Sequence, residues 1–167
     1  IELFSNKETL SPVIDTQRMS LFLIQNRLNN PISGTTPDFV AETKNTGGSA
    51  AAKYITRPII LENDSTSLDI RISANIRSGS AVKVYYRVTS SEDARKLGDV
   101  DWRGFNEDGS PDTAVTPALN NITFREQKFS ASNIPAFTAF QLKVVLTGTN
   151  SSYPPLLKDM RGIALAV

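Results

Sequence analysis

The sequence predicts an all-β fold, an antiparallel two-sheet β-sandwich that is jelly-roll-like and carries two long loops. Eight short runs have the alternation or the apolar content of β-strands, and stretches rich in Gly, Pro, Asn and Ser separate them. Sustained helical periodicity is nearly absent. A chain of 167 residues suffices for one domain with a buried core, so a single sandwich is expected over residues 1–167.

The first third of the chain contains three predicted strands and the first long loop. Residues 1–10 are expected to connect to a missing upstream part, because the chain does not begin with Met. Apolar runs predict strands at 12–15, 19–25 and 54–61. Between them, residues 29–52 are rich in small and polar side chains, which predicts a surface loop or, alternatively, an arm that lies against a neighbouring subunit.

The clearest predicted strand covers residues 68–76. Leu68, Ile70 and Ile72 alternate with polar residues, as in a half-buried strand. A second alternating run at residues 81–88 follows after a short link that contains Gly, so the two strands are predicted to form a hairpin.

Basic side chains occupy the outward phases of the predicted strands. Arg71, Lys83, Arg87 and Lys143 are therefore expected to lie on an exposed face, either in water or paired with Asp69.

A second long loop is predicted at residues 98–119, after a short helix at 91–97 with Ser91 as its candidate N-cap. The loop carries a dense group of acidic residues. Their spacing fails the EF-hand pattern, so the favoured interpretation is a solvated turn around Asp108 and Gly109, with an irregular calcium site as the alternative. An acid pair for a hydrolase would need a cleft that sequence does not show.

The last third contains three predicted strands and a corner. Pro154 and Pro155 cannot continue a strand ladder, which predicts an extended corner before the chain re-enters the sheet at Lys158. The apolar phase then slips, which suggests a bulge at Gly162. The final strand is expected to close the sandwich. The three strands are predicted at residues 122–129, 140–146 and 160–167.

Composition argues against several classes of function. The chain has no cysteine and no histidine, so it lacks disulfides, thiolate nucleophiles and the most common general base. We therefore expect no enzymatic activity, no cofactor and no bound metal. The net charge of +1 carries no signature of nucleic-acid binding. No segment approaches the roughly 20 apolar residues that span a bilayer, so no membrane insertion is expected.

Two long runs resemble a known family. SPVIDTQRMSLFLIQNRLNNP at 11–31 and AAKYITRPIILENDSTSLDIRISANIRSGSAVKVYYRV at 51–88 resemble the C-terminal region of large virion structural proteins of T-even-like contractile-tailed cyanophages. DWRGFNEDGSPD at 101–112 and the ending from 140 to 167 are similar to parts of the same family, so the resemblance covers nearly the whole chain.

The resemblance implies a non-enzymatic tail or baseplate component, a wedge or fibre-attachment protein. Such a protein would be made in the host cytoplasm and built into the virion in several copies, by contact with other tail subunits. The family supplies no catalytic residues. The residues predicted to make contacts lie in the two loops. Trp102 and Phe105 belong to the second loop, and Asn45, Thr46, Gly47 and Gly48 belong to an arm of the first loop that runs from Asn45 to Ala52.

The alternative is a carbohydrate-binding adhesion module, because the predicted architecture also resembles carbohydrate-binding and discoidin-like jelly rolls. Trp102 and Phe105 would then form a sugar platform with Tyr85 and Tyr86. The favoured interpretation is structural: Tyr86 points inward, and the other two rings fasten the long loop to the sandwich. Trp102 distinguishes the two functions, because a sugar platform must be exposed.

Overall fold

The structure is a computed structural model that describes residues 7, 9–15, 20–25, 40–150 and 153–166. These residues form ten strands and one 3-10 turn, and they contain no α-helix. Each of the eight predicted runs overlaps an observed strand. Most of the predicted connector at 1–10, and residues 29–39 of the first loop, lie outside the described residues. The elements are β1 (Leu10–Asp15), β2 (Ser20–Gln25), β3 (Lys53–Ile55), β4 (Ile59–Ser65), β5 (Ser67–Asn75), β6 (Ser80–Thr89), η1 (Leu97–Asp99), β7 (Arg103–Gly104), β8 (Arg125–Ala131), β9 (Phe137–Gly148) and β10 (Leu156–Leu165).

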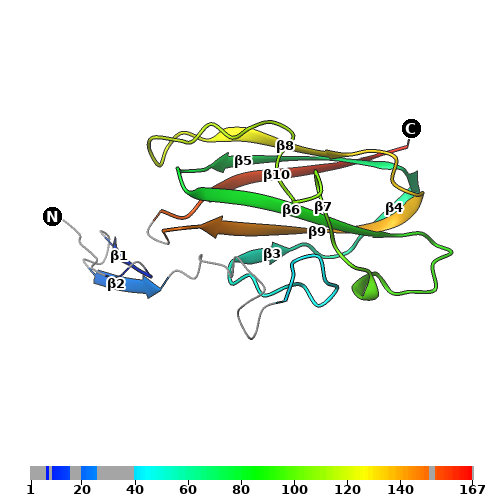
Figure 1. Ribbon diagram of the computed structural model, residues 1–167, viewed down its shortest axis with the longest axis horizontal. Coiled ribbons are helices and arrows are strands. Elements are labelled where there is room, and N and C mark those ends of the chain that lie inside the picture. Colours follow the sequence, from blue (N-terminus) through cyan, green and yellow to red (C-terminus); the bar gives the residue numbers. More distant parts are fainter. Residues whose placement is uncertain (1–6, 8, 16–19, 26–39, 151–152, 167) are drawn as a thin grey trace.

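Two antiparallel sheets make up the sandwich (Figure 1). One sheet has the order β10-β5-β8, and the other has the order β3-β9-β6-β7, with β4 also paired to β9. The predicted all-β, two-sheet class is therefore confirmed. The pair β1-β2 lies to one side in Figure 1, and within the described residues it pairs with no strand of the sandwich.

The predicted hairpin between residues 68–76 and 81–88 is wrong. β5 pairs with β8 and β10, whereas β6 pairs with β9 and β7, so the chain crosses from one sheet to the other at the turn between them. Alternation of apolar residues shows which face of a strand is buried, but it does not distinguish a lateral neighbour from a strand across the core. β4, β5 and β6 alternate between the sheets, as do β8, β9 and β10, which gives the fold its jelly-roll-like connections.

The predicted helix at 91–97 is also wrong. Residues before Leu97 form turns, and only Leu97–Asp99 makes a 3-10 turn. The Asp93 carboxylate accepts hydrogen bonds from the guanidinium of Arg95 at 2.8 Å and from its backbone N–H at 2.9 Å. These two hydrogen bonds lower the pKa of Asp93 to about 2. Local bonds of this kind compete with helix formation.

The predicted strand at 54–61 is divided into β3 and β4. Pro58, just before β4, has no N–H to donate to a ladder. Thr56 holds the break against β9: its N–H donates to the carbonyl of Leu142 at 2.9 Å, and its hydroxyl accepts from the Leu142 N–H at 3.0 Å.

The bulge in β10 lies at a different residue from the predicted one. The strand begins at Leu156 rather than Lys158, and its register against β5 shifts between Leu157 and Asp159. Gly162 instead faces the core, where an added Cβ would lie 3.1 Å from the Cδ1 of Ile70. The predicted bulge at Gly162 is therefore wrong, because the register against β5 is regular from Asp159 to Leu165.

The core lies between the two sheets. Inward side chains of β5, β6 and β9 fill it, together with Phe129 of β8 and Phe105 of the long loop, both 0% exposed. Tyr86 belongs to this core, as predicted. The aromatic rings of Tyr86, Phe105 and Phe129 pack in series, with centroids 4.9 and 6.1 Å apart, and join the two sheets.

Candidate interaction site

A buried lysine lies on the outer face of the β6 and β9 strands. Lys143 was predicted to be exposed, but its side chain is 0% exposed because residues 40–52 and the start of the second loop cover this face. Its ammonium contacts the Glu42 carboxylate at 3.0 Å and the Gly47 carbonyl at 3.0 Å, and it also donates to the Glu42 carbonyl. Burial lowers the pKa of Lys143, although the hydrogen bond and charge of Glu42 oppose this effect.

Trp102 forms the other half of this site. It is only 2% exposed, and its ring lies 4.9 Å from the Lys143 ammonium and 4.3 Å from the Arg87 guanidinium carbon. Its backbone N–H donates to the Thr43 carbonyl at 2.8 Å, which ties the two loops together. The cation–π contacts stabilise the buried charge of Lys143 and the partly buried charge of Arg87.

Phe105 anchors the same loop from the inside of the sandwich. Its N–H donates to the Val84 carbonyl at 3.1 Å, and its own carbonyl accepts from Gly109 at 2.7 Å. Trp102 and Phe105 thus fasten the loop on opposite faces of one sheet, as the structural interpretation predicted. Because both rings are buried within the domain, neither offers contact area to a partner in this conformation.

The described part of the predicted arm is packed on its own domain. The Asn45 N–H donates to Asp101 at 2.9 Å, and the carbonyls of Gly47 and Gly48 accept from Lys53 at 3.0 and 2.7 Å. Gly47 is buried, whereas Asn45 and Thr46 are exposed. Of the residues predicted to make contacts, only Asn45 and Thr46 therefore present side chains to solvent.

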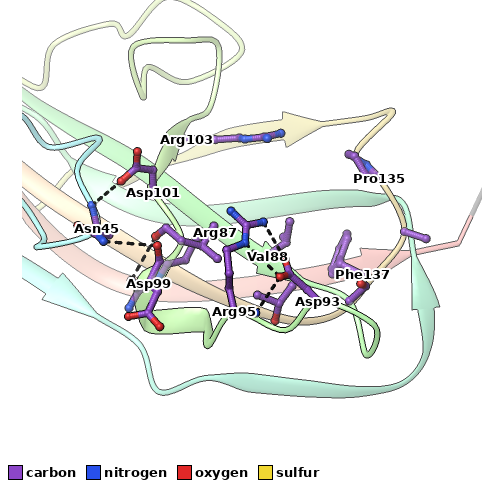
Figure 2. Close-up of a pocket in the computed structure, with 14 residues that line it drawn as sticks. Asn45, Arg87, Val88, Asp93, Arg95, Asp99, Asp101, Arg103, Pro135 and Phe137 are labelled. Carbon is purple, nitrogen blue, oxygen red and sulfur yellow. Dashed lines mark hydrogen bonds and ion pairs between the residues drawn. The ribbon is translucent and has the colours of Figure 1, made fainter.

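A polar groove of about 450 Å³ lies between the arm and the loops that follow β6 and β8 (Figure 2). Figure 2 shows Asn45 directed at Asp99 and Asp101, and Arg95 paired with Asp93. Arg87 donates two hydrogen bonds to Gln141 and one to the Gly98 carbonyl. Asp93 and Arg95 thus pair with each other, and Arg87 and Asp101 bond to uncharged neighbours, which favours a structural role for these four side chains.

The predicted turn at Asp108 and Gly109 is confirmed. Gly109 has a φ of 87°, and an added Cβ would lie 3.1 Å from the Val84 carbonyl. The Asp108 carboxylate pairs with Lys83 at 2.8 Å and accepts from the Ser110 hydroxyl at 2.7 Å. Across the described residues, no group of three or more acidic side chains is arranged to hold a metal ion.

Acid is expected to weaken the Asp108 turn. The hydrogen bonds from Lys83 and Ser110 hold the pKa of Asp108 below its usual value of 3.8, so their stabilisation is present above that value and is lost as the pH falls further. At pH 7, Asp108→Asn should cost roughly 0.5–1 kcal/mol of unfolding free energy, as for exposed ion pairs. Urea midpoints at pH 7, 4 and 2.5 test this, because the difference from wild type should shrink at pH 2.5. If the urea midpoints of wild type and Asp108→Asn differ as much at pH 2.5 as at pH 7, the ionised Asp108 carboxylate does not stabilise the turn.

The free edge of β10 carries several exposed apolar side chains on one strand. Among the described strands, β10 pairs only with β5, and every residue from Leu156 to Ile163 is exposed. Met160 and Leu157 lie opposite inward residues of β5, yet they remain 38% and 40% exposed. Sequence pattern missed this feature, because an edge strand and a covered strand share the same alternation. The large apolar residues exposed along the strand are Leu156, Leu157, Met160, Ile163 and Leu165.

Comparison with known proteins gives little similarity. No family model matches the chain, and no curated protein sequence matches it. Solved structures of infectious bursal disease virus are weakly similar. Its VP2 subviral particle is 13% identical with a TM-score of 0.31, covering 79% of this chain and 35% of that one. Its Gx strain is 12% identical with a TM-score of 0.33, covering 84% of this chain and 38% of that one.

This chain therefore spans little more than a third of the length of those viral chains. No helix among the described residues is long and apolar enough to cross a membrane.

Proposed function

We propose that the chain is a non-enzymatic structural module of a virion, part of a tail baseplate as a wedge or fibre-attachment component. It works by contact with other tail subunits that assemble in several copies, and glycans are not its ligands. The proposal starts from the sequence resemblance to cyanophage tail proteins. The structural observation that carries it is the row of exposed apolar side chains along β10.

An exposed apolar row on a long edge strand supports assembly by contact. Soluble monomers seldom leave a contiguous apolar patch in water, and such patches mark interaction sites. In β10 the row coincides with backbone N–H and C=O groups that no neighbouring strand of the described residues occupies. Side chains and backbone can then be covered together by one partner strand.

The glycan alternative loses its proposed platform. A sugar ring stacks on an exposed aromatic face, but Trp102 is 2% exposed and its face is occupied by Arg87. Tyr85 is 7% exposed and Tyr86 is 8% exposed. Within the described residues, none of the four aromatic side chains considered for this role is available to a ligand.

Immunogold labelling tests the assignment to the tail. Antibodies raised against the purified chain are expected to label the tail end of particles of a contractile-tailed cyanophage that encodes it, and isolated tails should give the same label. Label on the capsid, or on no part of the particle, would contradict the proposal.

Tryptophan fluorescence separates the two functions. Trp102 is the single tryptophan of the chain, so titration with bacterial surface glycans reports on its surroundings directly. We expect emission typical of a buried indole and no change with any glycan. A saturable shift that Trp102→Phe abolishes, in a variant that remains folded, would favour the adhesion module instead.

A further inference from the structure

Among the described residues, β10 is the longest edge strand of the sandwich. At the opposite edge of the same sheet, β8 carries the charged residues Arg125, Glu126 and Lys128. In the second sheet, β7 has two residues, β3 has three, and the pairing of β4 is interrupted by a register shift. Short, charged or irregular edges resist pairing with another chain. β10 is ten residues long, and although it has a register shift near its start and three charged residues, its pairing with β5 is regular from Asp159 to Leu165.

Symmetry limits how two copies could pair through this edge. Two identical antiparallel strands form one continuous sheet when a two-fold axis runs perpendicular to it. Directly opposite residues must point to the same face of the sheet. The axis therefore lies beside a residue of one chain that is directly opposite the same residue of the other chain. In the middle of the exposed segment, the candidates are Asp159, Met160 and Arg161.

Charge selects one of these three registers. An axis at Asp159 would set two carboxylates opposite each other, and an axis at Arg161 would do the same with two guanidinium groups. Like charges directly opposite each other destabilise a sheet. An axis at Met160 instead sets Asp159 of each copy opposite Arg161 of the other, which forms two ion pairs of opposite charge.

Both charged groups can make this contact. Within the described residues, the carboxylate of Asp159 has no hydrogen-bond or ion-pair partner, and its backbone lies in the ladder with β5. One nitrogen of Arg161 contacts the Glu126 carboxylate at 2.5 Å, but the side chain is 69% exposed. A guanidinium has five N–H donors, so Arg161 can hold a second carboxylate without losing the first.

The bulge in β10 keeps apolar residues opposite one another. Lys158 is the residue in excess over β5 at the register shift. When it is extruded in both copies, Leu157 faces Gly162 of the other copy and Leu156 faces Ile163. Leu156 and Ile163 are 38% and 48% exposed on the outward face of the sheet, so pairing removes both from water.

We infer that β10 pairs with the β10 strand of a second copy of this chain, about a two-fold axis at Met160, to form a six-stranded sheet of order β8-β5-β10-β10-β5-β8. The inference rests on the proposed function, in which this edge is a contact surface, and names the partner as the same chain.

Cysteine cross-linking tests the register. The chain has no cysteine, so an introduced thiol has no competitor. Cβ atoms of directly opposite residues lie about 4.5–5.5 Å apart, close to the separation in a disulfide. Met160→Cys is expected to form a covalent dimer on mild oxidation. Ile163→Cys is the matched control, because its opposite residue is Leu156, and it should remain uncross-linked at the same protein concentration.

Charge reversal tests the ion pairs. Asp159→Arg and Arg161→Asp each replace both attractions by repulsions, and each should raise the dimer dissociation constant roughly 10-fold or more. Mixing the two variants restores both attractions, so a heterodimer should form at concentrations where each variant alone is monomeric. Arg125→Asp, on the opposite edge of the sheet, should leave the dimer unchanged. Sedimentation equilibrium measures all four.

The outcomes separate this inference from the proposed function. A wild-type chain that stays monomeric, or equal cross-linking of Met160→Cys and Ile163→Cys, overturns pairing through β10 at this register. If the chain still labels phage tails, the proposed function stands with a different partner on the edge. A dimer that the mixed variants restore supports the inference even if the tail assignment fails.

Discussion

Replacing Phe105 by alanine is expected to lower the free energy of unfolding by about 3–5 kcal/mol, the usual cost of emptying a buried aromatic site. The ring is 0% exposed and touches an aromatic ring from each sheet. Its loss leaves a cavity between the sheets and releases the loop that carries it. For a domain of this size, the melting temperature should fall by roughly 6–20 °C.

Circular dichroism against temperature and urea measures the effect of Phe105→Ala. Leu119→Ala is the matched control, because Leu119 lies in the same loop but is 91% exposed. The control should stay within about 0.5 kcal/mol of wild type. Equal stability of the two variants would show that Phe105 does not join the sheets.

Glu42→Ala should be nearly as damaging for an electrostatic reason. It leaves the ammonium of Lys143, whose side chain is 0% exposed, without its carboxylate. Breaking a buried ion pair by removing one partner costs about 3–5 kcal/mol, and we expect the lower end because the Glu42 side chain is 18% exposed. Lys143→Met keeps the packing against the aromatic rings and removes the charge, so it should cost less, and the double variant should recover most of the loss.

The dependence on pH checks the same site. Burial lowers the pKa of Lys143 below its usual value of 10.5, so the unfolded chain binds this proton more tightly and stability rises with pH towards that value. The rise should be steeper in Glu42→Ala and absent in Lys143→Met. Measurements between pH 7 and 9.5 avoid Tyr85, whose pKa burial raises from 10.0 to about 12 and whose stabilisation falls at higher pH. Parallel pH profiles for the three proteins would contradict this account.

Alternation predicted the strands because it records burial along a single segment. It could not predict their neighbours, since β5 and β6 have the pattern of a hairpin but lie across the core from one another. Which strands pair depends on the packing of the whole chain. Pro58 marks the break between β3 and β4 in the sequence. The predicted helix at 91–97 does not form, and there the carboxylate of Asp93 accepts a hydrogen bond from the Arg95 N–H.

The candidate site was predictable only in part. The roles of Trp102 and Phe105 in fastening the loop follow from their position as the aromatic residues of a polar segment. The burial of Lys143 was not predicted, because the alternation of the strand placed it on the outward face. It nevertheless interrupts the run from Leu142 to Val145, in which both faces of the strand are buried. A continuous apolar run indicates a strand covered on both sides. A lysine inside such a run therefore signals a buried charge that needs a partner.

The crossings of the chain between the two sheets also affect how it folds. Leu68 of β5 lies between Ala131 of β8 and Ala164 of β10, so its lateral neighbours are far away in sequence. Folding rates fall as such separations grow, and β-sandwiches fold on the millisecond-to-second scale. During synthesis, β5 remains without one neighbour until the last of these strands has emerged. Nascent chains that stop short of residue 156 should therefore be held by chaperones, and chains that include β10 should be released from them.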